Sequence, residues 1–295
     1  MIIILGASGY IGNFLFNKFR EENIKVIGTY SKHPRPGLIS FNLDGPMDFE
    51  KIKVKAGEKN YMIISASVHA RPDECKLNWE ESYQTNVVKI KEVIDYCFDH
   101  DIIPIYLSTD NVFDGVKGNY SEEDNTNPIN CYGRIKWMVE NYLISSQKPF
   151  VIIRMGKVFG TKMGDGTYFT GLIQEMHEKK TVKCATDQIF TPCFVEDLYI
   201  ALKFIMEKEY AGTFHLASTE PITRYQAAQA IKRIFELDGV TIIPSTIDSF
   251  NLPDYRPKLI DLNISKWKKM SGFEEKAMEY YLGMIDYGSR NRVKN

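Results

Sequence analysis

The chain starts with Met1-Ile2-Ile3-Ile4-Leu5-Gly6-Ala7-Ser8-Gly9-Tyr10-Ile11-Gly12, an apolar run that leads directly into three glycines. Their spacing is GxxGxxG, and helical periodicity follows. Glycines in a strand-to-helix turn let the backbone bend sharply and approach a pyrophosphate, whose charge is stabilised by the helix N-terminal amides. The stretch therefore predicts the first strand, turn and helix of a dinucleotide-binding unit. The residues expected to contact the dinucleotide are Gly6, Ser8, Gly9, Tyr10, Ile11 and Gly12.

Short apolar runs and longer amphipathic stretches alternate after this turn. Four further runs have the length and the Ile, Val and Tyr content of buried parallel strands, at 25–29, 61–66, 102–108 and 150–154. Helical stretches lie between them at 11–22, 79–99 and 132–145. Strands that alternate with helices predict an α/β fold, a Rossmann-type doubly wound parallel sheet.

The composition excludes several classes of protein. The 295 residues include 37 Lys+Arg and 38 Asp+Glu, a net charge of −1, which gives no electrostatic footprint for nucleic acid or for a membrane surface. Apolar runs fall far short of the ~20 residues that span a bilayer. Five scattered cysteines without a CxxC pair predict reduced thiols, and with no signal-peptide pattern we expect a cytoplasmic protein. We expect no metal, because no His, Cys or carboxylate cluster has ligand spacing.

The end of the second predicted strand indicates the type of dinucleotide. Residues 29–35 carry hydroxyls and cations. Between the end of this strand and Asp44 there is no carboxylate that could bind the free 2′-hydroxyl of NAD. This pattern favours the 2′-phosphate of NADP, with a solvated basic loop as the alternative. Asn42 and Leu43 are expected to close over the adenine. The other residues expected at the cofactor are Tyr30, Ser31, Lys32, Ser65, Ala66 and Ser67.

Tyr132 and Lys136 form a YxxxK pair near the start of a predicted helix, one turn apart on one face. A nearby ammonium and a positive cofactor ring favour the phenolate, so we expect a lowered tyrosine pKa. The tyrosine could then exchange a proton with a substrate oxygen while the nicotinamide exchanges a hydride. Thr109, at the end of the preceding strand, would hold the substrate carbonyl beside Tyr132. A surface pair on a helix is the alternative for this motif.

Four segments in this order resemble the extended short-chain dehydrogenases: GASGYIG (6–12), STDNVFDG (108–115), PxNxYGRIK (128–136) and RMGKVFG (154–160). Among these the chain is most similar to the dTDP-4-dehydrorhamnose reductase family, from residue 1 to about 270. The resemblance implies NADPH-dependent reduction of a 4-keto-6-deoxy nucleotide sugar, with Thr109, Tyr132 and Lys136 as the catalytic triad. A homodimer remains open as the oligomeric state. The residues expected at the sugar nucleotide are His69, Thr109, Asp110, Asn111, Val112, Phe113, Gln188 and Arg256, the last on the diphosphate.

Departures from this family keep other functions open. Asn111 stands where the family usually has tyrosine, and residues 65–69 replace an Asn-Ala-Ala-x-Thr-like stretch. The regulatory β subunit of methionine adenosyltransferase also resembles the chain, including a stretch like Arg71-Pro72-Asp73; such a protein keeps the cofactor and acts on a partner. Sugar dehydratases carry an acidic residue at the position of Asn111, which argues against them. Epimerases lack the Thr-Asp dipeptide and are less favoured.

The sequence changes in character after about residue 160. Four glycines between 160 and 171 predict a crossing between two lobes, and an irregular stretch at 244–262 precedes a polar helix pair that begins at Ser265. Helices are expected at 195–207 and 224–235, with a strand at 213–217. We assign residues 1–160 to an NADP-binding Rossmann domain, to which the chain is expected to return around 185–217. Residues 161–295 are assigned mainly to a smaller substrate-binding lobe.

Overall fold

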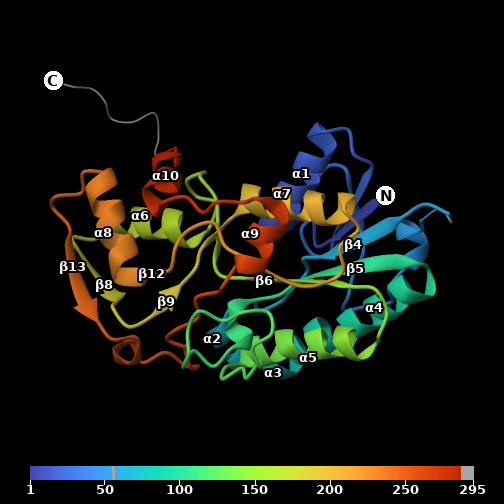
Figure 1. Ribbon diagram of the computed structural model, residues 1–295, viewed down its shortest axis with the longest axis horizontal. Coiled ribbons are helices and arrows are strands. Elements are labelled where there is room, and N and C mark those ends of the chain that lie inside the picture. Colours follow the sequence, from blue (N-terminus) through green and yellow to red (C-terminus); the bar gives the residue numbers. More distant parts are fainter. Residues whose placement is uncertain (55–56, 287–295) are drawn as a thin grey trace.

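The molecule is organised around one parallel sheet (Figure 1). In the computed structural model, which describes residues 1–54 and 57–286, its strands are β1 (Ile2–Leu5), β2 (Val26–Tyr30), β3 (Leu38–Ser40), β4 (Asn60–Ile64), β5 (Ile102–Leu107), β6 (Val151–Met155) and β11 (Gly212–Leu216). Their order is β11-β6-β5-β4-β1-β2-β3, so the chain winds outward in both directions from β1 and β4. This confirms the predicted Rossmann-type doubly wound sheet. β3 was not predicted from the sequence.

Helices cover both faces of this sheet. One face is packed by α1 (Tyr10–Glu21), α7 (Val195–Glu207) and α9 (Ser265–Ser271), and the other by α4 (Ile90–Asp99) and α5 (Cys131–Ser145). Alternate residues of β1 serve the two cores, Ile2 and Ile4 on the α1 face and Ile3 on the α4 face. This is why the strands read as continuous apolar runs. Trp267 of α9 closes the first face, with its ring edge-on to Phe204.

The crossover from β4 to β5 differs from the predicted single helix over 79–99. It contains α2 (Pro72–Leu77), α3 (Trp79–Tyr83) and a π-helical turn, η2 (Gln84–Lys89), before α4 begins. Asn86 in this turn is buried. Its side chain accepts from the backbone amide of Val68 (2.9 Å) and donates to the backbone carbonyl of Val68 (2.8 Å). The turn therefore attaches the helical layer to the loop that follows β4.

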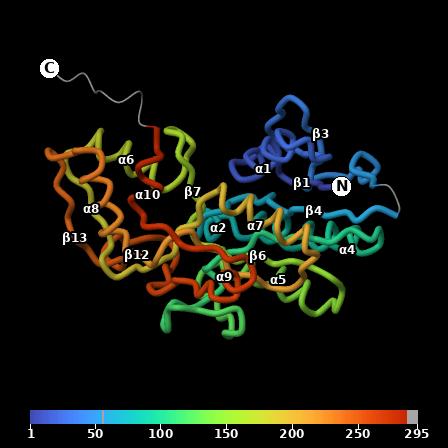
Figure 2. The backbone as a smooth tube through the Cα atoms, turned by 45° about the horizontal axis from the view of Figure 1, so that its top comes forward, coloured from blue at the N-terminus to red at the C-terminus, as the bar shows by residue number. Residues whose placement is uncertain are grey.

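A second apolar core lies at the other end of the molecule, seen at the left in Figures 1 and 2. Its elements are β7 (Val158–Phe159), α6 (Tyr168–Glu178), β8 (Thr181–Ala185), β9 (Ile189–Phe190), β10 (Cys193–Phe194), β12 (Ile222–Thr223), α8 (Arg224–Ile234), β13 (Thr241–Ser245) and α10 (Met278–Gly283). β13 pairs with β8 in parallel, where the sequence predicted irregular chain from residue 244. Short helical turns complete the described chain: η1 (Phe49–Ile52), η3 (Asp110–Val112) and η4 (Ile247–Phe250).

The chain passes between these two cores several times. Residues 160–167 lead from β7 to α6, and the chain later comes back so that β11 pairs with β6 at the edge of the large sheet. The division into domains at residue 160 stays a prediction. Within the described residues, no helix has both the length and the apolarity that crossing a bilayer requires.

Candidate functional site

A cavity of about 750 Å³ lies at the carboxyl ends of the sheet strands, where they face the second core. Gly9 follows β1, Ser65 follows β4 and Thr109 follows β5, and all three line it together with Gln188 and Arg224 from the other side. Open α/β sheets bind ligands at this edge, and the volume falls in the range of roughly 300–1,000 Å³ for small-molecule sites. The cavity is therefore the candidate site.

The glycine-rich turn forms one end of this site with a backbone that side chains would obstruct. Gly6 has a φ of +86°, and a Cβ there would lie 2.7 Å from Cα of Ala66. A Cβ on Gly12 would lie 2.3 Å from the carbonyl oxygen of Gly6. Gly9 precedes α1 and provides no side-chain cap, so the first amides of this helix remain available to an anion. These residues fit the pyrophosphate of a dinucleotide.

The predicted adenosine-side residues gather at the ends of β2 and β3, outside the cavity. The Ser31 hydroxyl donates to Oδ1 of Asn42 (2.9 Å), and Leu43 is largely buried. Nζ of Lys32 lies 3.6 Å from the carboxylate of Asp44. The carboxylate that the sequence placed beyond the strand end thus folds back beside the lysine and offsets part of its charge.

Tyr132, Lys136 and Thr109 meet on the wall of the cavity. Oδ1 of Asn130 accepts from the amide of Gly133 (2.7 Å), and this cap starts α5 just before Tyr132. Nζ of Lys136 donates to the carbonyl of Leu107 (2.9 Å) and lies 6.0 Å from the centre of the Tyr132 ring. The Thr109 side chain is near enough to the Tyr132 phenol to favour its ionised form.

Burial strongly affects the pKa values of Tyr132 and Lys136. Burial and the carboxylate of Asp110 raise the pKa of Tyr132, against the opposing effect of Thr109. Burial lowers the pKa of Lys136 to about 8, although Glu140 counteracts it. Among the protein's own groups, burial has the largest effect on the Tyr132 pKa. Tyr132 therefore keeps its proton at neutral pH. The lowering expected beside a positively charged nicotinamide ring stays a prediction.

A buried ion pair lies beneath the triad. Arg154 of β6 donates to the Glu140 carboxylate through Nη2 (2.8 Å) and Nε (3.0 Å), and both side chains are almost fully buried. The hydroxyl of Ser108 donates to the same carboxylate, one residue before Thr109. The pair therefore connects the strand end that carries Thr109 to the helix that carries Lys136.

The segment after Thr109 divides between the cavity and the core. The Thr109 hydroxyl donates to Oδ1 of Asp110 (2.9 Å), and the same oxygen accepts from the side-chain Nδ2 of Asn111 (2.8 Å). Asp110 and Asn111 line the cavity, and burial raises the pKa of Asp110 to about 6. Val112 and Phe113 are fully buried in a cluster with Tyr120, so their side chains do not reach the cavity.

Two predicted substrate residues are engaged by other side chains. His69, in the loop after β4, is not part of the cavity lining. Its Nε2 lies 3.0 Å from the carboxylate of Glu81 in α3. Arg256 does line the cavity, with Nη2 2.7 Å from the carboxylate of Asp73 in α2. The guanidinium also donates to the carbonyl of Asp254 (3.0 Å). Arg256 is therefore oriented by Asp73 of α2 and by the carbonyl of Asp254, two residues before it in the chain.

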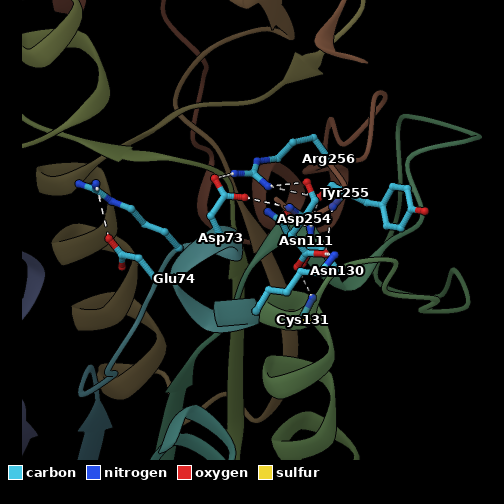
Figure 3. Close-up of polar contacts among 10 residues, drawn as sticks. Asp73, Glu74, Asn111, Asn130, Cys131, Asp254, Tyr255 and Arg256 are labelled. Atoms are coloured by element: carbon cyan, nitrogen blue, oxygen red, sulfur yellow. Dashed lines mark hydrogen bonds and ion pairs between the residues drawn. The ribbon is translucent and has the colours of Figure 1, made fainter. Parts of the chain in front are cut away.

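Arg256 belongs to a segment that we call the strap (residues 251–257), which is attached to two helices of the large sheet (Figure 3). The buried carboxylate of Asp254 accepts from the amide of Cys131 at the start of α5 (2.8 Å). Asn130 donates to the carbonyl of Tyr255 (3.3 Å), and Asp73 accepts from the amide of Asp254 (3.1 Å). The strap therefore holds the C-terminal half of the chain against the cavity.

Several cavity residues were not identified from the sequence. They are Arg71, Lys157, Asp165, Tyr168 and Arg224. Lys157 was quoted within the segment RMGKVFG, and Arg224 begins a predicted helix, but neither position shows in the sequence that it faces the cavity. Among residues 1–54 and 57–286, no group of three or more His, Cys, Asp or Glu side chains is arranged to hold a metal. The structure thus brings the predicted triad, glycine turn, Gln188 and Arg256 together and adds cations to them.

Comparisons with known proteins give the site a family. A model described as the RmlD substrate binding domain matches residues 1–285. A probable low-salt glycan biosynthesis reductase, Agl14, from Haloferax volcanii is 27% identical over 290 residues, 96% of each chain. Methionine adenosyltransferase 2 subunit beta from Rattus norvegicus is 26% identical over 273 residues, 90% of this chain and 80% of the relative.

A solved structure agrees with this match in fold. The dTDP-4-dehydrorhamnose reductase from Bacillus anthracis, in complex with NADP, superposes with a TM-score of 0.83 at 22% identity and covers 96% of this chain and 97% of its own. The family model spans both the glycine-rich turn and the strap. The chain therefore belongs to the RmlD substrate binding domain family, the dTDP-4-dehydrorhamnose reductases among the extended short-chain dehydrogenases.

Proposed function

We propose that this chain is an NADPH-dependent reductase of a 4-keto-6-deoxy nucleotide sugar, in which Tyr132 gives the proton. The observation that carries the proposal is the meeting of Thr109, Tyr132 and Lys136 on one cavity wall, beside the glycine-rich turn. Membership of the dTDP-4-dehydrorhamnose reductase family supports the substrate class. The NADP in the Bacillus anthracis reductase supports the cofactor.

The residues of the chain fit such a cofactor along one side of the cavity. The amides after Gly9 would hold the pyrophosphate of the dinucleotide, and Ser65 and Ser67 would lie beside the same dinucleotide. Lys136 would contact its nicotinamide ribose. NADPH, when bound, supplies the hydride.

Each triad residue has a distinct task at the substrate oxygen. Tyr132 keeps its phenolic proton, because burial and Asp110 raise its pKa, and a reduction needs a donor in this state. The Thr109 hydroxyl lines the same cavity wall and would orient the substrate carbonyl beside Tyr132. Lys136, anchored on the carbonyl of Leu107, stabilises the negative charge that Tyr132 acquires when its proton leaves.

The test is direct. The purified chain is incubated with NADPH and a panel of 4-keto-6-deoxy nucleotide sugars that differ in nucleotide, and loss of NADPH absorbance is followed. We expect turnover with at least one sugar. Tight NADPH binding without turnover on any of them would overturn the reductase assignment.

A second candidate is a regulatory subunit that binds NADP without turnover. It is favoured by the 26% identity to methionine adenosyltransferase 2 subunit beta over 90% of this chain. Adding the chain to a methionine adenosyltransferase catalytic subunit, and measuring complex formation and catalytic rate, separates the two candidates. The regulator predicts a complex and a changed rate, whereas the reductase predicts neither.

A further inference from the structure

Two cations on the cavity wall have no carboxylate partner. Lys157 follows the end of β6, and Arg224 is the first residue of α8. Within the described parts of the chain, neither forms an ion pair, whereas Arg256 on the same cavity is paired with Asp73 at 2.7 Å. The two thus carry charge toward the cavity without an ion pair, although Asp110 attracts both of them electrostatically.

Arg224 is held rigidly by neutral groups. Its Nε donates to Oε1 of Gln188, which is itself buried and donates to the carbonyl of Pro257 (3.1 Å). The guanidinium carbon lies 4.6 Å from the centre of the Tyr168 ring and 5.1 Å from that of Phe190. Aromatic faces and an amide orient a guanidinium without cancelling its charge. Arg224 is therefore preorganised to bind an anion.

Lys157 lines the same cavity as Asp110 and Thr109. Its Nζ lies 5.9 Å from the centre of the Tyr168 ring, and Asp110 attracts its charge. Surrounding protein, Arg224, Arg256 and Arg71 lower the pKa of Lys157 to about 7, while Asp110 opposes them. Positive charges crowded on one wall destabilise the folded chain, and an anion bound between them relieves that repulsion.

Resting on the reductase function proposed above, we propose that Lys157 and Arg224 form an oxyanion subsite for the substrate, with Arg224 as a bidentate fork and Lys157 as a point charge beside Asp110. The 4-keto-6-deoxy nucleotide sugar proposed above offers one group with this chemistry, its diphosphate. A carboxylate occurs only on uronic-acid sugars, so a carboxylate in this subsite would replace the 6-deoxy substrate class. The glycine-rich turn serves the cofactor pyrophosphate, so this subsite belongs to the substrate.

Calorimetric titration of the full chain, saturated with NADP to block the cofactor site, tests the subsite. The probes are inorganic pyrophosphate, dTDP-glucose and dTDP-glucuronic acid. Lys157→Met and Arg224→Met should each weaken binding of at least one probe by about tenfold to a hundredfold, the scale of one charge-assisted contact. Lys183→Met, which removes an exposed lysine from β8, should change no affinity.

The probes distinguish the source of the anion. If the diphosphate occupies the subsite, the variants weaken both sugars and pyrophosphate alike. If a sugar carboxylate occupies it, the wild type prefers dTDP-glucuronic acid to dTDP-glucose, and the variants lose this preference. A wild type that binds none of the probes, or folded Lys157→Met and Arg224→Met proteins with unchanged affinity for all of them, overturns the subsite.

These measurements involve no turnover. Probe binding that depends on Lys157 and Arg224, in a chain that reduces no 4-keto sugar, would keep the subsite and overturn the reductase function. Reduction of a 4-keto sugar by a Lys157→Met protein with an unchanged KM for that sugar would keep the reductase function and overturn the subsite.

Discussion

Tyr132 owes its chemistry to the residues that surround it rather than to its position in a motif. Burial and Asp110 raise the pKa of the phenol, and Thr109 opposes them. Tyr132→Phe keeps the ring and removes the proton, so we expect reduction to fall by about 10²-fold or more. Steady-state kinetics and NADPH titration would show lost turnover with little change in cofactor affinity. Tyr142→Phe on the same helix is the matched control, and near-normal turnover in Tyr132→Phe would remove Tyr132 from the mechanism.

Asp110 gives a pH-dependent prediction. Its pKa rises from 3.8 to about 6 because burial outweighs the hydrogen bonds of Thr109 and Asn111 and the attraction of Lys157 and Arg224. A raised carboxyl pKa means that the folded state binds the proton more tightly, so this residue costs stability as pH rises from about 4 to about 6 and above.

Asp110→Asn should therefore raise the free energy of unfolding at pH 7 by an amount on the order of 3 kcal/mol and leave it nearly unchanged at pH 4. Urea unfolding at the two pH values measures this difference. An equal effect at both values would show that Asp110 does not titrate in this range.

Single residues were predictable where a motif fixes a role and not where the role depends on contacts across the chain. Tyr132 and Lys136 stand one helical turn apart, so their meeting follows from local geometry. Arg224 faces the cavity because α8 packs against Gln188 and Tyr168, contacts between residues tens of positions apart. The pKa of Tyr132 also depends on burial, and a sequence does not show burial directly.

At the scale of elements, the strap depends on one buried carboxylate. Asp254 accepts from the amides of Cys131 and Tyr255 and lies 3.8 Å from Nζ of Lys76. Asp254→Ala leaves those donors unsatisfied, at a cost of about 1–3 kcal/mol each when buried. We expect faster amide hydrogen exchange in residues 130–133 and 252–257 and unchanged exchange in the sheet. Asp248→Ala, which removes an exposed carboxylate next to the strap, should leave the exchange unaltered.

The β2–β3 connection gives a prediction about cofactor choice. Lys32 and Arg35 are exposed in the connection where the sequence predicts a 2′-phosphate, and Asp44 offsets part of the Lys32 charge. Replacing both cations with alanine should weaken NADPH binding by about tenfold or more and leave NADH almost unchanged, because charge-assisted contacts contribute roughly 1.5–3 kcal/mol. Titration of both cofactors against both proteins measures this. Equal affinities of the wild type for NADH and NADPH would make these residues ordinary surface cations.

Elements with strong periodicity were predicted well, and those that rely on tertiary pairing were not. The prediction of a helix over 195–207 matches α7, since its apolar face is regular. β13 is mostly exposed along its length and forms by pairing with β8, so no buried run marks it. The π-helical turn η2 keeps helical spacing on average, which is why 79–99 looked like one helix.

At the scale of the whole molecule, the Glu140–Arg154 pair joins α5 to β6, the strand beside the edge strand β11 of the large sheet. Breaking a buried pair from one side leaves an uncompensated charge, so Glu140→Leu and Arg154→Met should each lower the free energy of unfolding by about 3–5 kcal/mol. The double variant should lose less than the sum, because no lone charge remains. Urea unfolding of the three variants gives the coupling energy. Additive losses would mean that the two side chains stabilise the fold independently.

The packing of α9 bears on how the protein is made. A growing polypeptide leaves the ribosome from its N-terminus, so β1 to β5 emerge early and can pair while the rest is still being synthesised. The apolar face that they present under α7 and α9 is closed by Trp267, near the end of the described chain. Nascent chains shorter than about 270 residues therefore leave the part of this face that α9 covers exposed, the kind of surface that chaperones bind.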